Sequence, residues 1–210
     1  VLAALTGVMG DRLLANDNPF AIPMSLRHQG QPLNPDSIRS LPGATGKIAL
    51  MMHGLCMSDL QWSASQKTPG TDHAQALAST LGYTPIYLRY NSGMHISQNG
   101  RELAKQLEQL LPHWPTTIEE LTVVAHSMGG LVIRSAIYYA KEQDMAWPSL
   151  LKNIIFLGTP HHGAPLEKVG NWVDALMGST PFTRPFNALG KIRSAGITDL
   201  RFGNILDEDW

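Results

Sequence analysis

A serine stands among small residues in the run Ala125-His126-Ser127-Met128-Gly129, which approximates the pattern G-x-S-x-G. In this pattern a sharp turn from a strand into a helix projects the serine hydroxyl above the sheet, where it can attack a carbonyl carbon. The turn crowds the positions two before and two after the serine, so both must be small. Gly129 satisfies this condition, and Ala125 departs from the pattern by one methyl group. Ser127 is therefore the predicted nucleophile; the alternative is that it only caps a helix.

A carbonyl under attack develops negative charge on its oxygen, and two backbone N–H donors must already be in position to hold it. Met128, the residue after the nucleophile, is expected to supply one donor. Leu55, which follows an earlier apolar run, is expected to supply the other, because Gly54 permits a close approach of backbone. His53 is expected to brace this loop by hydrogen bonding. His126 is expected to line the site as a neighbour in the turn and not to act as the base.

Two adjacent histidines, His161 and His162, stand in the run GTPHHG after a later apolar stretch. Adjacent side chains of an extended segment point to opposite sides. Because no cluster of cysteines or carboxylates stands nearby to complete a zinc site, metal binding is not expected. The segment is instead predicted to be a loop that lines the site, with one histidine held by structural hydrogen bonds.

A serine hydroxyl is a weak nucleophile at neutral pH and needs a histidine base oriented by a carboxylate. In this type of site the acid and the histidine follow the serine, on loops after later strands. Only one clear strand, residues 153–157, follows Ser127. Either one of the two adjacent histidines works with Asp174 or Asp199, or the acid and the base lie beyond Trp210. The second explanation is favoured, and it predicts negligible ester hydrolysis by this chain alone.

These motifs belong to a regular alternation of strands and helices. Apolar runs predict strands at residues 47–54, 84–91, 121–126 and 152–158. Apolar residues at helical spacing predict helices over residues 72–81, 96–111 and 128–143. Such an alternation is typical of an α/β fold with a mostly parallel sheet and helices on both faces. Since ligands bind outside the carboxyl ends of parallel strands, the three motifs are expected to meet at one edge.

The chain divides into a lead-in and a predicted core. Residues 1–46 open with apolar positions at helical spacing and continue as a loop-rich stretch. Residues 47–210 are the predicted α/β core, incomplete at its C-terminus. Because the chain opens inside a helix without a methionine and stops without a closing strand, truncation at both ends is expected. An apolar helical face over residues 169–177 predicts a cap around residues 164–190; the alternative is an ordinary core helix.

Composition and charge limit the kinds of molecule that the chain is expected to bind. The formal net charge is −1 and lysine and arginine are scattered, so no nucleic-acid or anionic-membrane surface is expected. No apolar stretch reaches the ~20 residues that span a bilayer, and no basic region precedes the apolar N-terminus, so the expected location leans to the cytoplasm. Cys56, the single cysteine, is expected to be a small buried filler, and Asp59 to cap the segment after it. The oligomeric state stays open.

The chain resembles bacterial α/β-hydrolase-fold lipases and esterases of the GPI inositol-deacylase-like group in four segments, HGLCMSDLQW, YNSGMHISQNGREL, VVAHSMGGLVIRSA and FLGTPHHGAPLEKVGNWVD. The resemblance spans roughly residues 47–210. It implies a serine esterase that acts on ester or lipid substrates through an acyl-enzyme on Ser127, without a cofactor and with Leu55 and Met128 as oxyanion donors. Two alternatives stay open: acyl transfer to an alcohol at the same site, and a catalytically inactive binding module with this fold.

Overall fold

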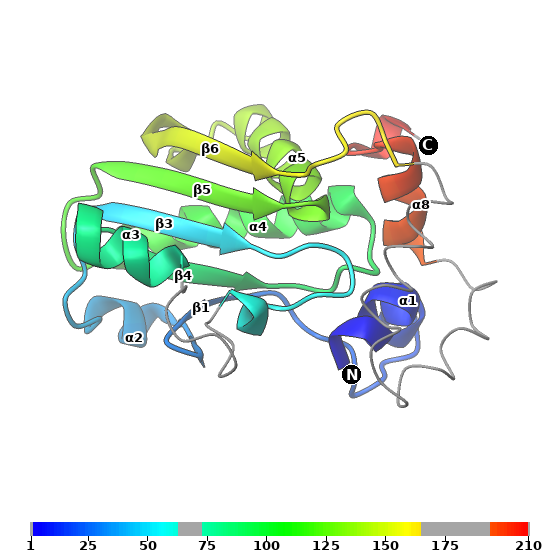
Figure 1. The fold of residues 1–210 in the computed structure, drawn as a ribbon, viewed down its shortest axis with the longest axis horizontal. Helices are drawn as coiled ribbons and strands as arrows, with labels where there is room; N and C mark the ends of the chain where they lie inside the picture. The colour runs from blue at the N-terminus through cyan, green and yellow to red at the C-terminus, as the bar shows by residue number, and fades with distance from the viewer. Residues whose placement is uncertain (1, 63–72, 165–193, 210) are drawn as a thin grey trace.

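The computed structural model describes residues 2–62, 73–164 and 194–209, and Figure 1 shows their arrangement. In chain order the elements are α1 (Leu2–Ala15), β1 (Ser25–His28), β2 (Gln31–Pro32), α2 (Pro35–Arg39), β3 (Lys47–Met52), η1 (Asp59–Gln61), α3 (His73–Leu81), β4 (Thr84–Arg89), α4 (Ile96–Leu110), η2 (Leu111–His113), β5 (Glu120–His126), α5 (Met128–Glu142), η3 (Trp147–Leu150), β6 (Leu151–Leu157), α8 (Ala195–Phe202) and η4 (Asp207–Asp209). No helix among these is long and apolar enough to cross a membrane.

The strands form one sheet in the order β2-β1-β4-β3-β5-β6. The four strands β4, β3, β5 and β6 run parallel, whereas β1 pairs antiparallel with both β4 and β2. The carboxyl ends of the parallel strands therefore meet at one edge, on the right in Figure 1, and α1 and α8 lie beyond that edge. The predicted fold class, α/β with a mostly parallel sheet and helices on both faces, is confirmed.

The central strand β3 is buried on both of its faces. Its residues Ile48, Leu50 and Met52 belong to the large apolar cluster that includes α4 and α5, while Met51 belongs to a smaller cluster with α3. All four side chains are at most 2 % exposed. Burying an apolar side chain of this size contributes about 1.5–3 kcal/mol. This double burial explains the unbroken apolar run, and it anchors the loop that follows β3.

The lead-in differs from the expected loop-rich stretch, because it contains the hairpin β1–β2 and the helix α2. The hairpin strands have four and two residues, too short to show an alternating pattern. Its turn is made by Gln29 and Gly30, both at positive φ, which suits the tight hairpin turns. Helix α2 begins with a cap from Asn34, whose Oδ1 accepts from the N–H groups of Asp36 and Ser37. The division of the chain into a lead-in at residues 1–46 and a core at residues 47–210 stays a prediction.

The described C-terminal segment, residues 194–209, returns to the beginning of the chain. Ser194 Oγ donates a hydrogen bond to the carbonyl of Gly7 at 2.7 Å, and the N–H of Ala195 donates to Asp11 Oδ2 at 3.0 Å. Helix α8 therefore lies against α1, in a part of the chain where the sequence pattern predicts no helix. Beyond Ala164, the predicted cap around residues 164–190 lies outside the described residues.

Candidate active site

The connection between β5 and α5 is a single residue, Ser127, with a strained backbone. Its φ is 50° and its ψ is −120°, a conformation that residues with a side chain rarely adopt. Strain of this kind costs on the order of 1–3 kcal/mol and persists only where neighbours hold it. Here the N–H of Ser127 donates to the carbonyl of Leu157 at 2.9 Å, and its own carbonyl accepts from Gly130 at 3.1 Å. The backbone thus makes a sharp turn at the carboxyl edge of the sheet.

The small residues around this turn meet the end of β3. A Cβ atom added to Gly129 would lie 2.7 Å from the carbonyl oxygen of His53 and 3.1 Å from that of Met52. Ala125, on the other side of the turn, is fully buried in the large apolar cluster. The requirement for small side chains two residues either side of Ser127 therefore has a physical cause, which is the close packing of α5 on β3.

The loop after β3 lies directly against the turn. A Cβ atom added to Gly54 would lie 3.1 Å from the Cβ of Ser127 and 2.9 Å from Nδ1 of His126. The structure therefore brings the segments around Gly54 and Ser127 together, although they are far apart in the sequence. No hydrogen bond to a described residue occupies the backbone N–H of Leu55 or of Met128. Met128 is also the first residue of α5, where backbone N–H groups carry partial positive charge.

His53 holds this loop in place through ring stacking and hydrogen bonds. It is 1 % exposed, and its ring stacks on that of Tyr90 with 4.2 Å between centroids. Nε2 accepts from the N–H of Tyr90 at 3.4 Å, so Nδ1 carries the proton and donates to the carbonyl of Gly54 at 2.9 Å. Tyr90 Oη donates to the carbonyl of His53 at 2.8 Å. Burial lowers the pKa of His53 to about 4, so its ring is neutral at pH 7.

The neutral state of His53 predicts a pH dependence of stability. The unfolded chain binds this proton at an ordinary pKa of 6.5 and the folded chain only at about 4. The contribution of His53 is therefore complete above pH 6.5 and is lost as the pH falls toward 4, by on the order of 3 kcal/mol. Urea unfolding at about pH 7.5 and about pH 4.5 measures it. His53→Gln should flatten the dependence, and His73→Gln, at an exposed position of α3, should leave it unchanged.

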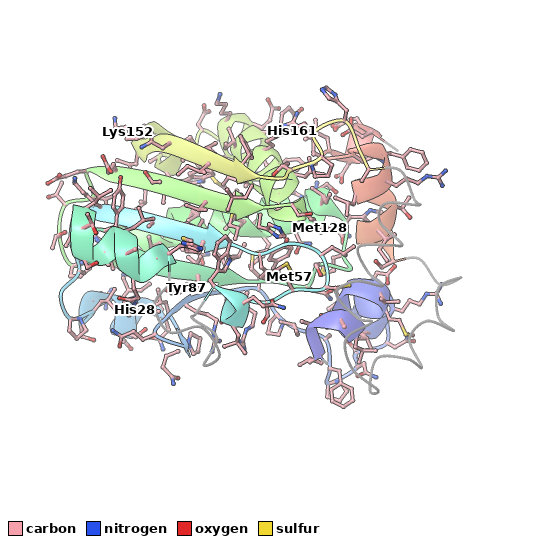
Figure 2. The ribbon with its side chains drawn as sticks, viewed as in Figure 1. His28, Met57, Tyr87, Met128, Lys152 and His161 are labelled. Carbon is pink, nitrogen blue, oxygen red and sulfur yellow. The ribbon has the colours of Figure 1, made fainter. Side chains whose placement is uncertain are left out.

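The loop after β6 carries the two adjacent histidines. Figure 2 labels His161 on this loop and Met128 at the start of α5, both at the carboxyl edge of the sheet. His161 is half-buried, its ring edge-on to Phe156 with 4.7 Å between centroids, and its Nδ1 lies 3.3 Å from Nη1 of Arg134. Burial and the positive charge of Arg134 lower the pKa of His161. His162 is exposed.

Asp199, one of the two candidate acids, pairs with neither of these histidines. Its carboxylate Oδ2 accepts from the N–H of Ile96 at 2.8 Å and from Nδ1 of His95 at 3.1 Å. Its side chain therefore caps the N-terminus of α4, whose own N-cap residue, His95, makes no side-chain cap. Burial raises the pKa of Asp199. Asp174, the other candidate acid, lies outside the described residues.

Two further expectations concern the loop after β3. Cys56 is buried as expected, and burial raises the pKa of its thiol to about 12. The expected helix cap at Asp59 is wrong, since the N-cap of η1 is Ser58. Asp59 is 4 % exposed and instead receives hydrogen bonds from Arg89, with Nε at 2.5 Å and Nη2 at 3.1 Å. Its other neighbour is Arg27, whose Nε lies 3.3 Å from Oδ2.

Among residues 2–62, 73–164 and 194–209, no group of three or more histidine, cysteine or acidic side chains is placed to hold a metal ion. Around the turn, the described residues present the hydroxyl of Ser127, the first backbone N–H of α5 at Met128 and the loop of Gly54.

Comparisons with known proteins agree on the fold. Two similar structures are those of the Bacillus licheniformis lipase BlEst2. Its propeptide form has a TM-score of 0.51 at 18% identity, covering 78% of this chain and 31% of that one. Its mature form has a TM-score of 0.50 at 19% identity, covering 85% of this chain and 64% of that one. This chain thus spans less than two thirds of the length of either, and at such identity the likeness shows the fold alone.

Family membership comes from the sequence itself. A search of curated proteins finds no match. A family model described as "Domain of unknown function (DUF7379)" matches residues 24–200, which include β1, every parallel strand and most of α8. The chain belongs to the DUF7379 family.

Proposed function

We propose that this chain carries the nucleophilic half of a serine hydrolase that cleaves carboxylic esters. The observation that carries the proposal is the single-residue turn at Ser127, with φ 50°, packed against the Gly54 loop at the carboxyl edge of the sheet. A positive φ at a residue with a side chain is costly, and such strain gathers at functional sites. A helix cap alone needs no such strain, because ordinary caps adopt extended backbone.

The proposed reaction has two steps. Ser127 Oγ forms a bond to the ester carbonyl carbon as the bond to the alcohol oxygen breaks, and the serine proton passes through a base to the departing alcohol. Water then attacks the acyl-enzyme in the same way, which releases the carboxylic acid and restores the serine. The N–H groups of Leu55 and Met128 hold the oxyanion in both steps, assisted by the N-terminal dipole of α5.

The other site residues have supporting roles in this proposal. Gly54 and Gly129 let three backbone segments approach Ser127 closely, and the neutral ring of His53 holds the Gly54 loop in place. His126 lines the turn, and the loop bearing His161 and His162 forms a wall of the site. The identity of the base and of its carboxylate stays a prediction.

The proposed substrates are ester or lipid molecules. The resemblance of four sequence segments to esterases of the GPI inositol-deacylase-like group supports this class, as does the likeness of the fold to that of a lipase. No nucleic-acid partner is proposed, since the net charge is −1. Acyl transfer to an alcohol would use the same serine and differs only in what attacks the acyl-enzyme.

A fluorophosphonate probe tests the proposal, because it reacts covalently with an activated serine. We expect the full-length protein, with its catalytic acid and histidine, to be labelled at Ser127, as located by peptide mass spectrometry. Ser127→Ala should abolish labelling, and Ser79→Ala, at an exposed serine of α3, should leave it intact. A folded full-length protein that takes up no label would contradict the proposal and favour the inactive binding module.

A further inference from the structure

A groove of about 470 Å³ opens beside the strands β1 and β4. It is bounded by the start of α1, by residues 19–23, by the edge strand β1 and by the segment that enters η1. Its volume falls within the roughly 300–1,000 Å³ of small-molecule sites. Neither Ser127 nor Gly54 lines it, and β3 lies between this groove and β5.

The walls of the groove are apolar and exposed. Leu2 is 43% exposed, Phe20 57% and Leu60 62%, and all three line the groove from different segments of the chain. Large apolar side chains scattered singly on a surface need no explanation, but a gathered set around a groove marks a binding surface. An apolar chain laid between them would remove all three from water.

The floor of the groove carries an excess of positive charge. Arg27 and Arg89 both line it, and the single carboxylate between them is that of Asp59. Arg89 makes the two hydrogen bonds to Asp59. Arg27 forms an ion pair with the same carboxylate through its buried Nε, which makes no hydrogen bond within the described part of the chain, and its Nη2 donates to the carbonyl of Gly30.

The electrostatics of Arg27 favour the binding of an anion in the groove. Its pKa is lowered, first by burial and then by the positive charge of Arg89, and the attraction of Asp59 does not compensate for both. An anion in the groove would balance the surplus positive charge that two arginines and one carboxylate leave there. Guanidinium groups pair with carboxylates through charge-assisted hydrogen bonds.

We propose that this groove binds an amphiphilic anion, with its carboxylate head against Arg27 and Arg89 and its apolar chain along Leu2, Phe20 and Leu60. The charge complementarity of the floor selects the head, and the exposed apolar walls select the chain. This site is separate from the one proposed at Ser127 and needs no catalysis there. Ester hydrolysis would release molecules of this class, so the groove would hold a product or an effector.

Calorimetric titration with dodecanoate below its micelle-forming concentration tests the proposal. The Ser127→Ala background removes any turnover. We expect dodecanoate to bind saturably. Dodecanol, which lacks the charge, and acetate, which lacks the apolar chain, should each bind at least about tenfold more weakly. Dodecyl phosphate tests how selective the groove is for the anionic head. Binding as tight as that of dodecanoate would mean that any anionic head is accepted, and much weaker binding would mean that a carboxylate is preferred. Absence of saturable dodecanoate binding, or equal affinity for dodecanol, would overturn the proposal.

Two variants locate the binding in the groove. Arg27→Gln should weaken dodecanoate binding at least about tenfold, and it leaves Asp59 paired with Arg89. Leu60→Glu places a negative charge at the mouth and should weaken binding similarly; its site is exposed, so the fold should be kept. Arg39→Gln, on exposed α2 outside the groove, is the matched control. Unchanged affinity in both groove variants would refute the site, whatever the result at Ser127.

Discussion

Replacing Ser127 by alanine is expected to lower kcat/KM for an aryl ester by about 10⁴–10⁶-fold, measured in a protein that includes the catalytic acid and histidine. The nucleophile is then absent, and the residual rate comes only from binding and from the oxyanion donors. Initial rates with a chromogenic ester measure the effect. Stability should change by less than about 1 kcal/mol, because alanine has a Cβ and bears the same backbone strain as serine.

Alanine is the informative substitution at this position. Glycine would also remove the hydroxyl, but it adopts φ 50° without strain and would alter the turn at the same time. Ser79→Ala serves as the control for the loss of a serine hydroxyl elsewhere. If Ser127→Ala kept more than about a tenth of the rate, the hydrolysis would have to come from another residue, and the assignment of the nucleophile would be wrong.

Gly54→Ala is expected to slow fluorophosphonate labelling and ester hydrolysis by about 10²–10³-fold. The added methyl group would lie 2.9 Å from Nδ1 of His126 and 3.1 Å from the Cβ of Ser127, so the loop must move away from the turn. A donor held at Leu55 would then leave the place of the oxyanion. The expected cost in stability is about 1–3 kcal/mol, which urea unfolding measures.

Gly46→Ala is the matched control for this effect. A methyl group there would lie 2.7 Å from the carbonyl oxygen of Thr117, a comparable clash at the opposite end of β3. It should therefore cost a similar amount of stability and leave the labelling rate unchanged. If both glycine variants slowed labelling equally, the effect would come from general destabilisation, and the Gly54 loop would have no part in oxyanion binding.

The sheet and the turn were predictable from sequence because their signals are local. The strands β3, β4 and β5 are buried in the sheet, so each shows as a short apolar run, and the edge strand β6 has a similar run although most of its residues are exposed. The turn demands small residues at fixed offsets from Ser127, and this demand is visible in five consecutive residues. Helix α8 was missed, although Ser194 caps it and Gly203 ends it at φ 76°. It has only eight residues, which is too few for a convincing helical period.

The polar pairs were not predictable, because their partners are far apart in the chain. Asp59 meets Arg89 thirty residues later, and Asp199 meets His95 at a separation of 104 residues. Nothing in the local sequence of either acid distinguishes an ion pair from a helix cap. One signal was available: α4 begins after His95, without an Asp, Asn, Ser or Thr at its N-cap, so an acceptor from elsewhere in the chain was required.

The contact between α1 and α8 joins residues that lie far apart in the order of synthesis. Ser194 Oγ bonds to the carbonyl of Gly7 at a sequence separation of 187 residues, and Ala195 bonds to Asp11 at a separation of 184. Helix α1 therefore leaves the ribosome well before α8, and its contacts with Asn91 can form before those with α8 exist. Contacts of such long range form late in folding, since the entropy of closing the intervening loop must be overcome first. The packing around α1 is thus completed only after all the strands of the sheet have been synthesised.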